Sequence, residues 1–104
     1  FGSPIIYVTE NGTNEANNRT LSIEEALVDD ARIDYHHRHL SSLREAIRED
    51  GVEVRGYFAW SLMDNFEWSW GYSVRFGTYY VDYRDGLTRR PKLSAHWFTN
   101  FLSK

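Results

Sequence analysis

Two short segments with the composition of buried β-strands constrain this chain more than any other feature. Residues 4–9 form a continuous apolar, β-branched run that ends at an Asn-Gly pair, and residues 52–61 form a second run whose later half is apolar. Such runs are typical of strands that a parallel sheet buries on both faces. Between them, apolar side chains recur at steps of three and four residues. This pattern predicts an amphipathic helix over residues 30–50, with Gly51 directly after its end.

The predicted elements alternate between strand and helix. Ser22 and Glu25 fit a capping box before a short helix, and residues 76–83 are expected to form a short strand. A bulky apolar stripe predicts a closing helix, and its members are Leu93, Trp97, Phe98, Phe101 and Leu102. Alternation of this kind predicts an α/β fold with a parallel sheet. Because two parallel strands alone leave exposed edges and apolar faces, we expect further strands, from a missing part of the same protein or from another chain, to complete the sheet.

The composition speaks against several classes of function. The chain has 12 basic and 15 acidic residues and a net charge of −3, which argues against a protein whose main task is to bind nucleic acid or an anionic membrane. Cysteine is absent, so disulfides, thiolate metal sites and cysteine nucleophiles are excluded. Seventeen of the 104 residues are aromatic, more than a core of this size hides easily. We therefore expect some of the rings to line a binding surface.

Two places in the chain are candidates for chemistry. Glu10 follows the first predicted strand, at the end where parallel α/β folds place catalytic groups, although a solvated acid beside an Asn-Gly turn is the alternative. The loop over residues 60–70 surrounds Asp64 and Glu67 with three tryptophans. Sugar rings stack their C–H faces on indole, and their hydroxyls need carboxylate acceptors. The loop therefore predicts a carbohydrate site, or alternatively an aromatic cluster with Glu67 at its rim.

Four motifs in this chain resemble glycoside hydrolase family 1, the retaining β-glucosidases and their relatives. Val-Thr-Glu-Asn-Gly at residues 8–12 resembles the nucleophile motif of the family, and residues 57–68 resemble its glycone-binding loop. Residues 76–82 and 90–98 resemble its closing segments, in a form typical of plant members. The resemblance extends over essentially the whole chain. It implies a (β/α)₈ TIM barrel of which this chain supplies the last two βα units, an incomplete C-terminal fragment that runs from strand seven to the final helix.

The resemblance also implies a role for each candidate residue. Glu10 is expected to be the nucleophile that forms a covalent glycosyl-enzyme. Glu67 is expected to accept hydrogen bonds from sugar hydroxyls, Trp60 to form the stacking floor, and Trp68 to donate its indole N–H to a hydroxyl. Phe76 is expected to lie near the pocket wall. The implied substrate is a β-glucoside, with galactose or fucose as alternative sugars, and the family needs neither a metal nor an organic cofactor.

The second carboxyl that such an enzyme needs is missing from the sequence. A retaining glycosidase uses two carboxyls roughly 5–5.5 Å apart, and the family carries its acid/base in an Asn-Glu-Pro motif that does not occur here. Asn14-Glu15 is followed by Ala16, and we interpret Glu15 as a solvated loop acid. A barrel of this type also needs about 250 residues. We therefore expect the isolated chain to be inactive and to need the upstream part of the barrel as its partner. A non-catalytic carbohydrate-binding or interaction fragment, or a truncated gene product, is the alternative.

Two further clusters have ordinary interpretations. His36, His37 and His39 are interpreted as helix-surface histidines, because a metal site needs more ligands in convergent geometry. The second cluster is a basic run, which we interpret as a solvated approach to the closing helix and not as a nucleic-acid surface. Its members are Arg84, Arg89, Arg90 and Lys92.

Overall fold

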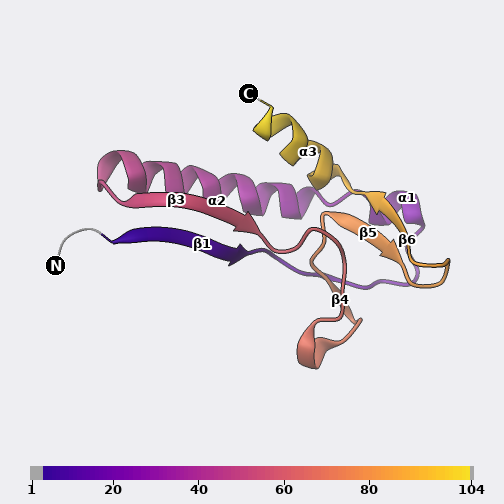
Figure 1. Ribbon diagram of the computed structural model, residues 1–104. Coiled ribbons are helices and arrows are strands. Elements are labelled where there is room, and N and C mark those ends of the chain that lie inside the picture. Colours follow the sequence, from indigo (N-terminus) through magenta and orange to yellow (C-terminus); the bar gives the residue numbers. More distant parts are fainter. Residues whose placement is uncertain (1–3, 104) are drawn as a thin grey trace.

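The first half of the molecule is a parallel pair of strands connected by a long helix. The computed structural model describes residues 4–103. In it β1 (Ile5–Asn11) and β3 (Glu53–Ala59) lie side by side and run in the same direction, while α2 (Asp30–Glu49) lies along the pair (Figure 1). The predicted parallel pairing is confirmed. Because the strands are parallel, their C-terminal ends lie next to each other, with Asn11 opposite Ala59.

Local sequence signals set the ends of the helices in this half. α1 (Ile23–Ala26) begins with the predicted capping box, in which the Ser22 hydroxyl accepts from the Glu25 N–H at 3.1 Å. The Glu25 carboxylate in turn accepts from the Ser22 N–H at 3.2 Å. Gly51 follows α2 with a φ of 67°, a left-handed conformation that glycine adopts without strain. The long helix thus ends where the sequence predicts.

The second half consists of short strands and turns between β3 and a closing helix. In chain order its elements are η1 (Trp68–Trp70, a 3₁₀ turn), β4 (Val74–Arg75), β5 (Tyr79–Asp82), β6 (Thr88–Pro91) and α3 (Leu93–Leu102). β4 pairs with β2 (Glu15–Ala16), and β5 forms a hairpin with β6 (Figure 1).

The closing helix is confirmed, whereas the strand predicted over residues 76–83 is shortened to β5. β2, β4 and β6 were not predicted. Strands of two residues are too short to show the alternation on which sequence prediction depends, and all four residues of β6 are exposed.

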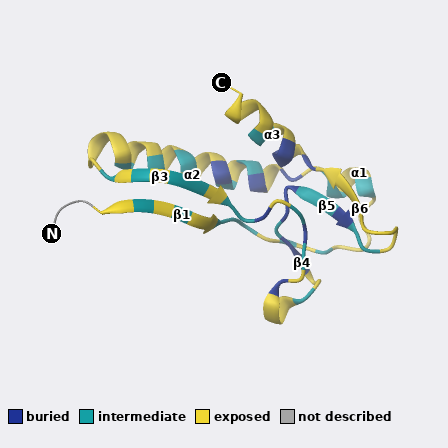
Figure 2. Ribbon diagram, in the orientation of Figure 1, coloured by how far each residue is buried: buried dark blue, intermediate teal, exposed yellow. Residues whose placement is uncertain are grey.

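The parallel pair is largely uncovered. Figure 2 shows β1 and β3 coloured exposed and intermediate, while the buried residues gather where α2, α3 and the short strands meet. Large side chains such as Ile5, Tyr7 and Phe58 are about half exposed. β1 and β3 are therefore not buried by this chain alone, as expected for two parallel strands whose edges and apolar faces no further strand of the described chain covers. The reason is that β1 and β3 form a sheet of two strands, whose outer edges have no neighbouring strand among residues 4–103.

Charged side chains form the most deeply buried cluster in the described chain. Asp29, directly before α2, accepts from Arg32 Nη1 at 2.8 Å and from the Ser94 N–H at 2.9 Å. Asp29 therefore ties the start of α2 to the start of α3. Arg32 continues the network, since its Nη2 donates to the backbone oxygen of Arg75 at 2.9 Å.

A second buried carboxylate, Asp64, is paired with two cations. It lies 2.6 Å from Arg75 Nη1 and 3.1 Å from Lys92 Nζ. Glu15 joins the same network at 3.2 Å from Arg32 Nη1. The network thus contains three carboxylates and three cations, and its formal charges balance. Since a buried charge is tolerated only when it is paired, this balance is what allows these groups to lie out of water.

Two sequence interpretations are corrected by this network. Lys92 was expected to be solvated, but its side chain is 0% exposed and burial, together with the nearby Arg32, lowers its pKa. Arg84, Arg89 and Arg90 are exposed as expected. Glu15 was also expected to be a solvated acid and is instead a half-buried partner of Arg32. Charge alone could not indicate which of these side chains finds a partner far along the chain.

Neither a membrane span nor a metal site is found in the described part of the chain. No helix within residues 4–103 is long and apolar enough to cross a bilayer. Over the same residues, no three or more His, Cys, Asp or Glu side chains are grouped so that they could hold a metal ion.

Candidate functional site

Glu10 lies at the C-terminal end of β1, where the pairing with β3 changes register. Val8 pairs with Tyr57 and Asn11 with Ala59, so three steps along β1 match two steps along β3. The extra residue interrupts the alternation of sides, and Thr9 and Glu10 are both exposed. Such irregularities redirect side chains and are frequent beside active sites. The Glu10 carboxylate is consequently presented to solvent at the strand end that the sequence predicts.

Trp60 follows β3 directly and lies against the end of β1. Its backbone N–H donates to the backbone oxygen of Asn11 at 2.7 Å. Gly12 permits this approach, because a Cβ atom built on it would lie 1.7 Å from the Trp60 oxygen. The peptide bond between Trp60 and Ser61 is cis. The residues that follow the two strands are therefore held together by direct backbone contact.

Glu67 is a buried carboxylate whose hydrogen bonding is incomplete. Its side chain is 7% exposed, and its Oε1 accepts from the indole N–H of Trp60 at 3.0 Å. The turn around it is fixed by the Glu67 N–H, which donates to the Gly71 oxygen at 2.9 Å. Its second oxygen, Oε2, has no hydrogen-bond partner among residues 4–103. Glu67 thus orients the Trp60 ring and keeps one oxygen available as an acceptor.

The two remaining candidates, Trp68 and Phe76, lie near Trp60 and Glu67 but differ in their exposure. Trp68, directly after Glu67, is 87% exposed, so its indole has little contact with the rest of the described chain. Phe76 is half-buried, and its backbone oxygen accepts from the Ser61 N–H at 3.1 Å, which places it beside the loop that begins at Trp60. Trp60 and Glu67 are therefore in direct contact, Glu10 and Phe76 each lie next to this pair through the backbone bonds of Asn11 and Ser61, and Trp68 projects outward from the same loop.

Asp64, the other carboxylate of this loop, has a structural role. Besides its two cations, its Oδ1 accepts from the Gly77 N–H at 2.9 Å. Gly77 is required there because a Cβ atom would lie 2.2 Å from the Asp64 nitrogen. The sequence contains the Asp and the cations but no sign that they meet, since Asp64 and Lys92 are 28 residues apart.

His36 was expected on the helix surface and is instead fully buried. Its Nδ1 lies 2.7 Å from the Tyr57 hydroxyl, and Phe98 packs edge-on against its ring. Burial, assisted by the positive charge of Arg32, lowers the pKa of His36 to about 4. His37 and His39 are exposed as expected. The difference arises because α2 turns Arg32 toward β4 and His36 toward β3 and α3, while the apolar side chains at residues 33, 40 and 43 are only half-buried.

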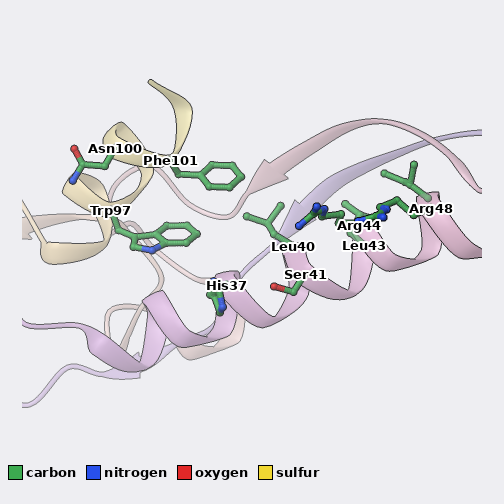
Figure 3. A pocket seen from close by; sticks show the side chains of 10 residues that line it. His37, Leu40, Ser41, Leu43, Arg44, Arg48, Trp97, Asn100 and Phe101 are labelled. Carbon is green, nitrogen blue, oxygen red and sulfur yellow. The ribbon is translucent and has the colours of Figure 1, made fainter. Parts of the chain in front are cut away.

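An apolar groove lies between α2 and α3, away from the candidate site. It has a volume of about 750 Å³, and Figure 3 shows Leu40 and Leu43 of α2 on one side and Trp97 and Phe101 of α3 on the other. Glu10, Trp60 and Glu67 are not among its lining residues. The groove is therefore a separate feature of the helical side of the molecule.

Comparison with known proteins identifies the family. The sequence profile of glycosyl hydrolase family 1 matches residues 1–104. The chain belongs to glycosyl hydrolase family 1. Beta-glucosidase 12 of Oryza sativa subsp. indica is 64% identical to this family 1 chain over 104 residues, and Beta-glucosidase 40 of Arabidopsis thaliana is 56% identical over 103 residues.

Solved structures of family 1 members contain the same arrangement. The rice Os3BGlu6 beta-glucosidase superimposes with a TM-score of 0.91 and 57% identity, covering 92% of this chain and 20% of that one. The beta-glucosidase from Thermotoga maritima, in complex with cyclophellitol, superimposes with a TM-score of 0.82 and 44% identity, covering 96% of this chain and 22% of that one. The two plant relatives are likewise covered over 20% of their length. This family 1 chain is thus a small α/β unit that spans about a fifth of the glucosidases it matches.

Proposed function

We propose that this chain is the C-terminal portion of a retaining β-glucosidase, and that β1 and β3 are strands seven and eight of its (β/α)₈ barrel. The observation that carries the proposal is the shared strand end. Glu10 and the Trp60–Glu67 pair emerge at the same end of two adjacent parallel strands, and Asn11 and Trp60 are joined there by a 2.7 Å hydrogen bond. Active sites of such barrels lie at the C-terminal ends of the strands.

In this proposal Glu10 is the nucleophile. Its carboxylate attacks the anomeric carbon of a β-glucoside, and the bond from that carbon to the leaving oxygen breaks as a carboxylic acid from the upstream part of the barrel gives the oxygen a proton. The same upstream group, now a carboxylate, takes a proton from the water that hydrolyses the glycosyl-enzyme. A mutant of the rice Os3BGlu6 beta-glucosidase has been solved in a covalent complex with Glc, which supports this course for a relative.

The loop after β3 holds the sugar in this proposal. Trp60 provides the stacking floor, and its orientation is fixed by the 3.0 Å bond to Glu67. The free Oε2 of Glu67 accepts from a sugar hydroxyl, and the exposed indole of Trp68 donates to another. Phe76 forms part of the wall. No metal or organic cofactor takes part in these steps.

The isolated chain is proposed to be inactive. It lacks the family's Asn-Glu-Pro acid/base motif, and within residues 4–103 no further strand pairs with either edge of β1 and β3. Since turnover needs two carboxyls on opposite sides of the scissile bond, Glu10 alone supplies the nucleophile and leaves the reaction without its acid/base. The partner of this chain is the upstream part of the barrel, which closes the sheet.

The test compares the isolated chain with a longer protein that contains the upstream barrel. A mechanism-based 2-fluoro-glucoside should attach covalently to Glu10 in the longer protein, as located by mass spectrometry, and Glu10→Gln should abolish both labelling and hydrolysis of an aryl β-glucoside. The isolated chain should show neither. Steady turnover by the isolated chain that Glu10→Gln abolishes would contradict the proposed inactivity.

A non-catalytic carbohydrate-binding fragment is the second candidate, favoured by the exposure of the aromatic loop. Phe66, Trp68 and Trp70 are all largely exposed in the isolated chain. This candidate predicts a sugar-dependent change in tryptophan fluorescence without covalent labelling, in the longer protein as well as in the fragment. Labelling of Glu10 in the longer protein would rule it out.

A further inference from the structure

A chain of hydrogen bonds runs from α2 to the residue that follows Glu10. The Tyr35 hydroxyl donates to Asn11 Oδ1 at 2.6 Å, and Asn11 Nδ2 donates to the Tyr57 hydroxyl oxygen at 3.0 Å. The Tyr57 hydroxyl lies 2.7 Å from His36 Nδ1. These contacts join α2, β1 and β3 through side chains that are separate from the buried charge network.

The donor and the acceptor of each of these hydrogen bonds follow from the number of protons that Asn11, Tyr57 and His36 carry. Because the Tyr57 oxygen already accepts from Asn11, its single proton is free to be donated to His36 Nδ1. With this assignment His36 is neutral and carries its proton on Nε2, a buried atom that has no hydrogen-bond partner among residues 4–103. This agrees with its full burial and with its lowered pKa. The Asn11 amide thus uses its oxygen to accept from Tyr35 and its nitrogen to donate to Tyr57. A flipped amide would make neither bond, so the two bonds together fix the orientation of the Asn11 side chain.

Asn11 is also fixed through its backbone. Its backbone oxygen accepts from the Trp60 N–H at 2.7 Å, and it closes the register shift that begins after Val8. Glu10 is the residue directly before it, inside the shifted segment, and its side chain is exposed. Because the Glu10 side chain is exposed and has no hydrogen-bond partner among residues 4–103, the backbone anchored at Asn11 is the structure that the described chain offers to orient it.

We propose that Tyr35, His36 and Tyr57 act through Asn11 as positioning residues that fix the direction of the Glu10 carboxylate relative to Trp60. They do not touch the substrate. The inference rests on the proposed function of Glu10 as nucleophile. In this inference α2, which lies along β1 and β3, helps to align the nucleophile with the sugar that Trp60 holds.

This role predicts an effect on the bond-forming step more than on substrate binding. Removal of the Tyr57 hydroxyl leaves Asn11 Nδ2 and His36 Nδ1 without their partner, so the Asn11 side chain is held by its Tyr35 bond alone and Glu10 loses part of its fixed direction. The sugar contacts of Glu67 and Trp68 are unchanged. Because misplacement of a reacting group by about 1 Å can cost on the order of 100-fold in rate, we expect the limiting rate of covalent labelling of Glu10 to fall about 10-fold or more.

The experiment uses the longer protein with Tyr57→Phe and, as a matched control, Tyr83→Phe. The Tyr83 hydroxyl is buried without a partner among residues 4–103, so its removal is the same chemical change without loss of a hydrogen bond. The rate of labelling by the 2-fluoro-glucoside is measured against reagent concentration, which separates the limiting rate from the binding constant. We expect Tyr57→Phe to lower the limiting rate with little change in the binding constant, and Tyr83→Phe to change neither.

A second pair of variants distinguishes positioning from mere stabilisation. His36→Asn keeps an acceptor near the position of Nδ1 for the Tyr57 hydroxyl and should retain more of the limiting rate than His36→Leu, which has the same shape and removes the acceptor. Equal limiting rates for Tyr57→Phe and Tyr83→Phe, or for His36→Asn and His36→Leu, would overturn the inference while Glu10 is still labelled in the parent. Absence of labelling in the parent protein would instead overturn the proposed function, and this inference with it.

Discussion

Asp64 is a buried carboxylate that is paired with two buried cations. Its carboxylate accepts from Arg75 Nη1 at 2.6 Å, Lys92 Nζ at 3.1 Å and the Gly77 N–H at 2.9 Å, and all of these groups are buried. Asp64→Asn keeps the shape of the side chain and removes its charge. Arg75 and Lys92 then face a neutral amide, and one of the donors meets the amide's own N–H₂ group.

The size of the effect follows from this geometry. Removal of one partner of a buried ion pair costs about 3–5 kcal/mol. A protein of the length of the plant relatives has about 500 residues. At an unfolding entropy of roughly 2.1 cal/mol/K per residue, about 1 kcal/mol corresponds to 1 °C in such a protein. We therefore expect Asp64→Asn to lower the melting temperature of the longer protein by about 3–5 °C.

The assay is thermal unfolding at a fixed scan rate, with Asp34→Asn as the matched control. Asp34 pairs with Arg38 at 2.9 Å, but both side chains are exposed, and such pairs contribute only about 0–1 kcal/mol. The control should shift the melting temperature by less than about 1 °C. Adding Lys92→Met to Asp64→Asn restores the charge balance of the network, so the double variant should melt above the Asp64→Asn single variant. The reasoning would be refuted if Asp64→Asn had the same melting temperature as Asp34→Asn, or if the double variant had a lower melting temperature than Asp64→Asn alone.

Three further predictions concern acid stability, close packing and the exposed tryptophan. Since the pKa of His36 is about 4 in the fold and about 6.5 when unfolded, the folded state binds fewer protons between these values. The free energy of unfolding that the neutral His36 contributes is fully present above pH 6.5 and falls by at most about 3 kcal/mol as the pH is lowered toward 4. His36→Gln lacks this titration. The melting temperature of the parent should therefore fall toward that of His36→Gln between pH 6.5 and pH 4. Gly12→Ala places a Cβ against the Trp60 oxygen and should lower kcat/KM for an aryl β-glucoside by about 100-fold; near-normal activity would mean that the strand ends need not touch. Trp68→Ala should weaken sugar binding while leaving the melting temperature within about 1 °C, because the indole is exposed, and a larger fall would show that the ring packs in the longer protein.

The elements that the sequence predicted well are those whose signals are local. The capping box at Ser22 and the glycine after α2 lie within a few residues of the helix ends that they set, and both are found where they were predicted. The parallel pairing of the two strands followed from the alternation of strand and helix. The position of Glu10 at the strand end followed from the same order, whereas its role and those of Trp60, Glu67, Trp68 and Phe76 remain predictions.

By itself, then, the sequence determined the family, the order of the two parallel strands and the longer helices, and the strand end at which the candidate residues gather, because these depend on residue types and on spacings of a few positions. Only the tertiary structure decided which charged and polar side chains are buried. Lys92, Glu15 and His36 were each assigned to the surface, and each is buried or half-buried against partners that the chain brings from far away. Asp29 and Ser94 meet across 65 residues. Burial of a charge depends on whether a counter-charge arrives in the folded molecule, and no local pattern carries that information.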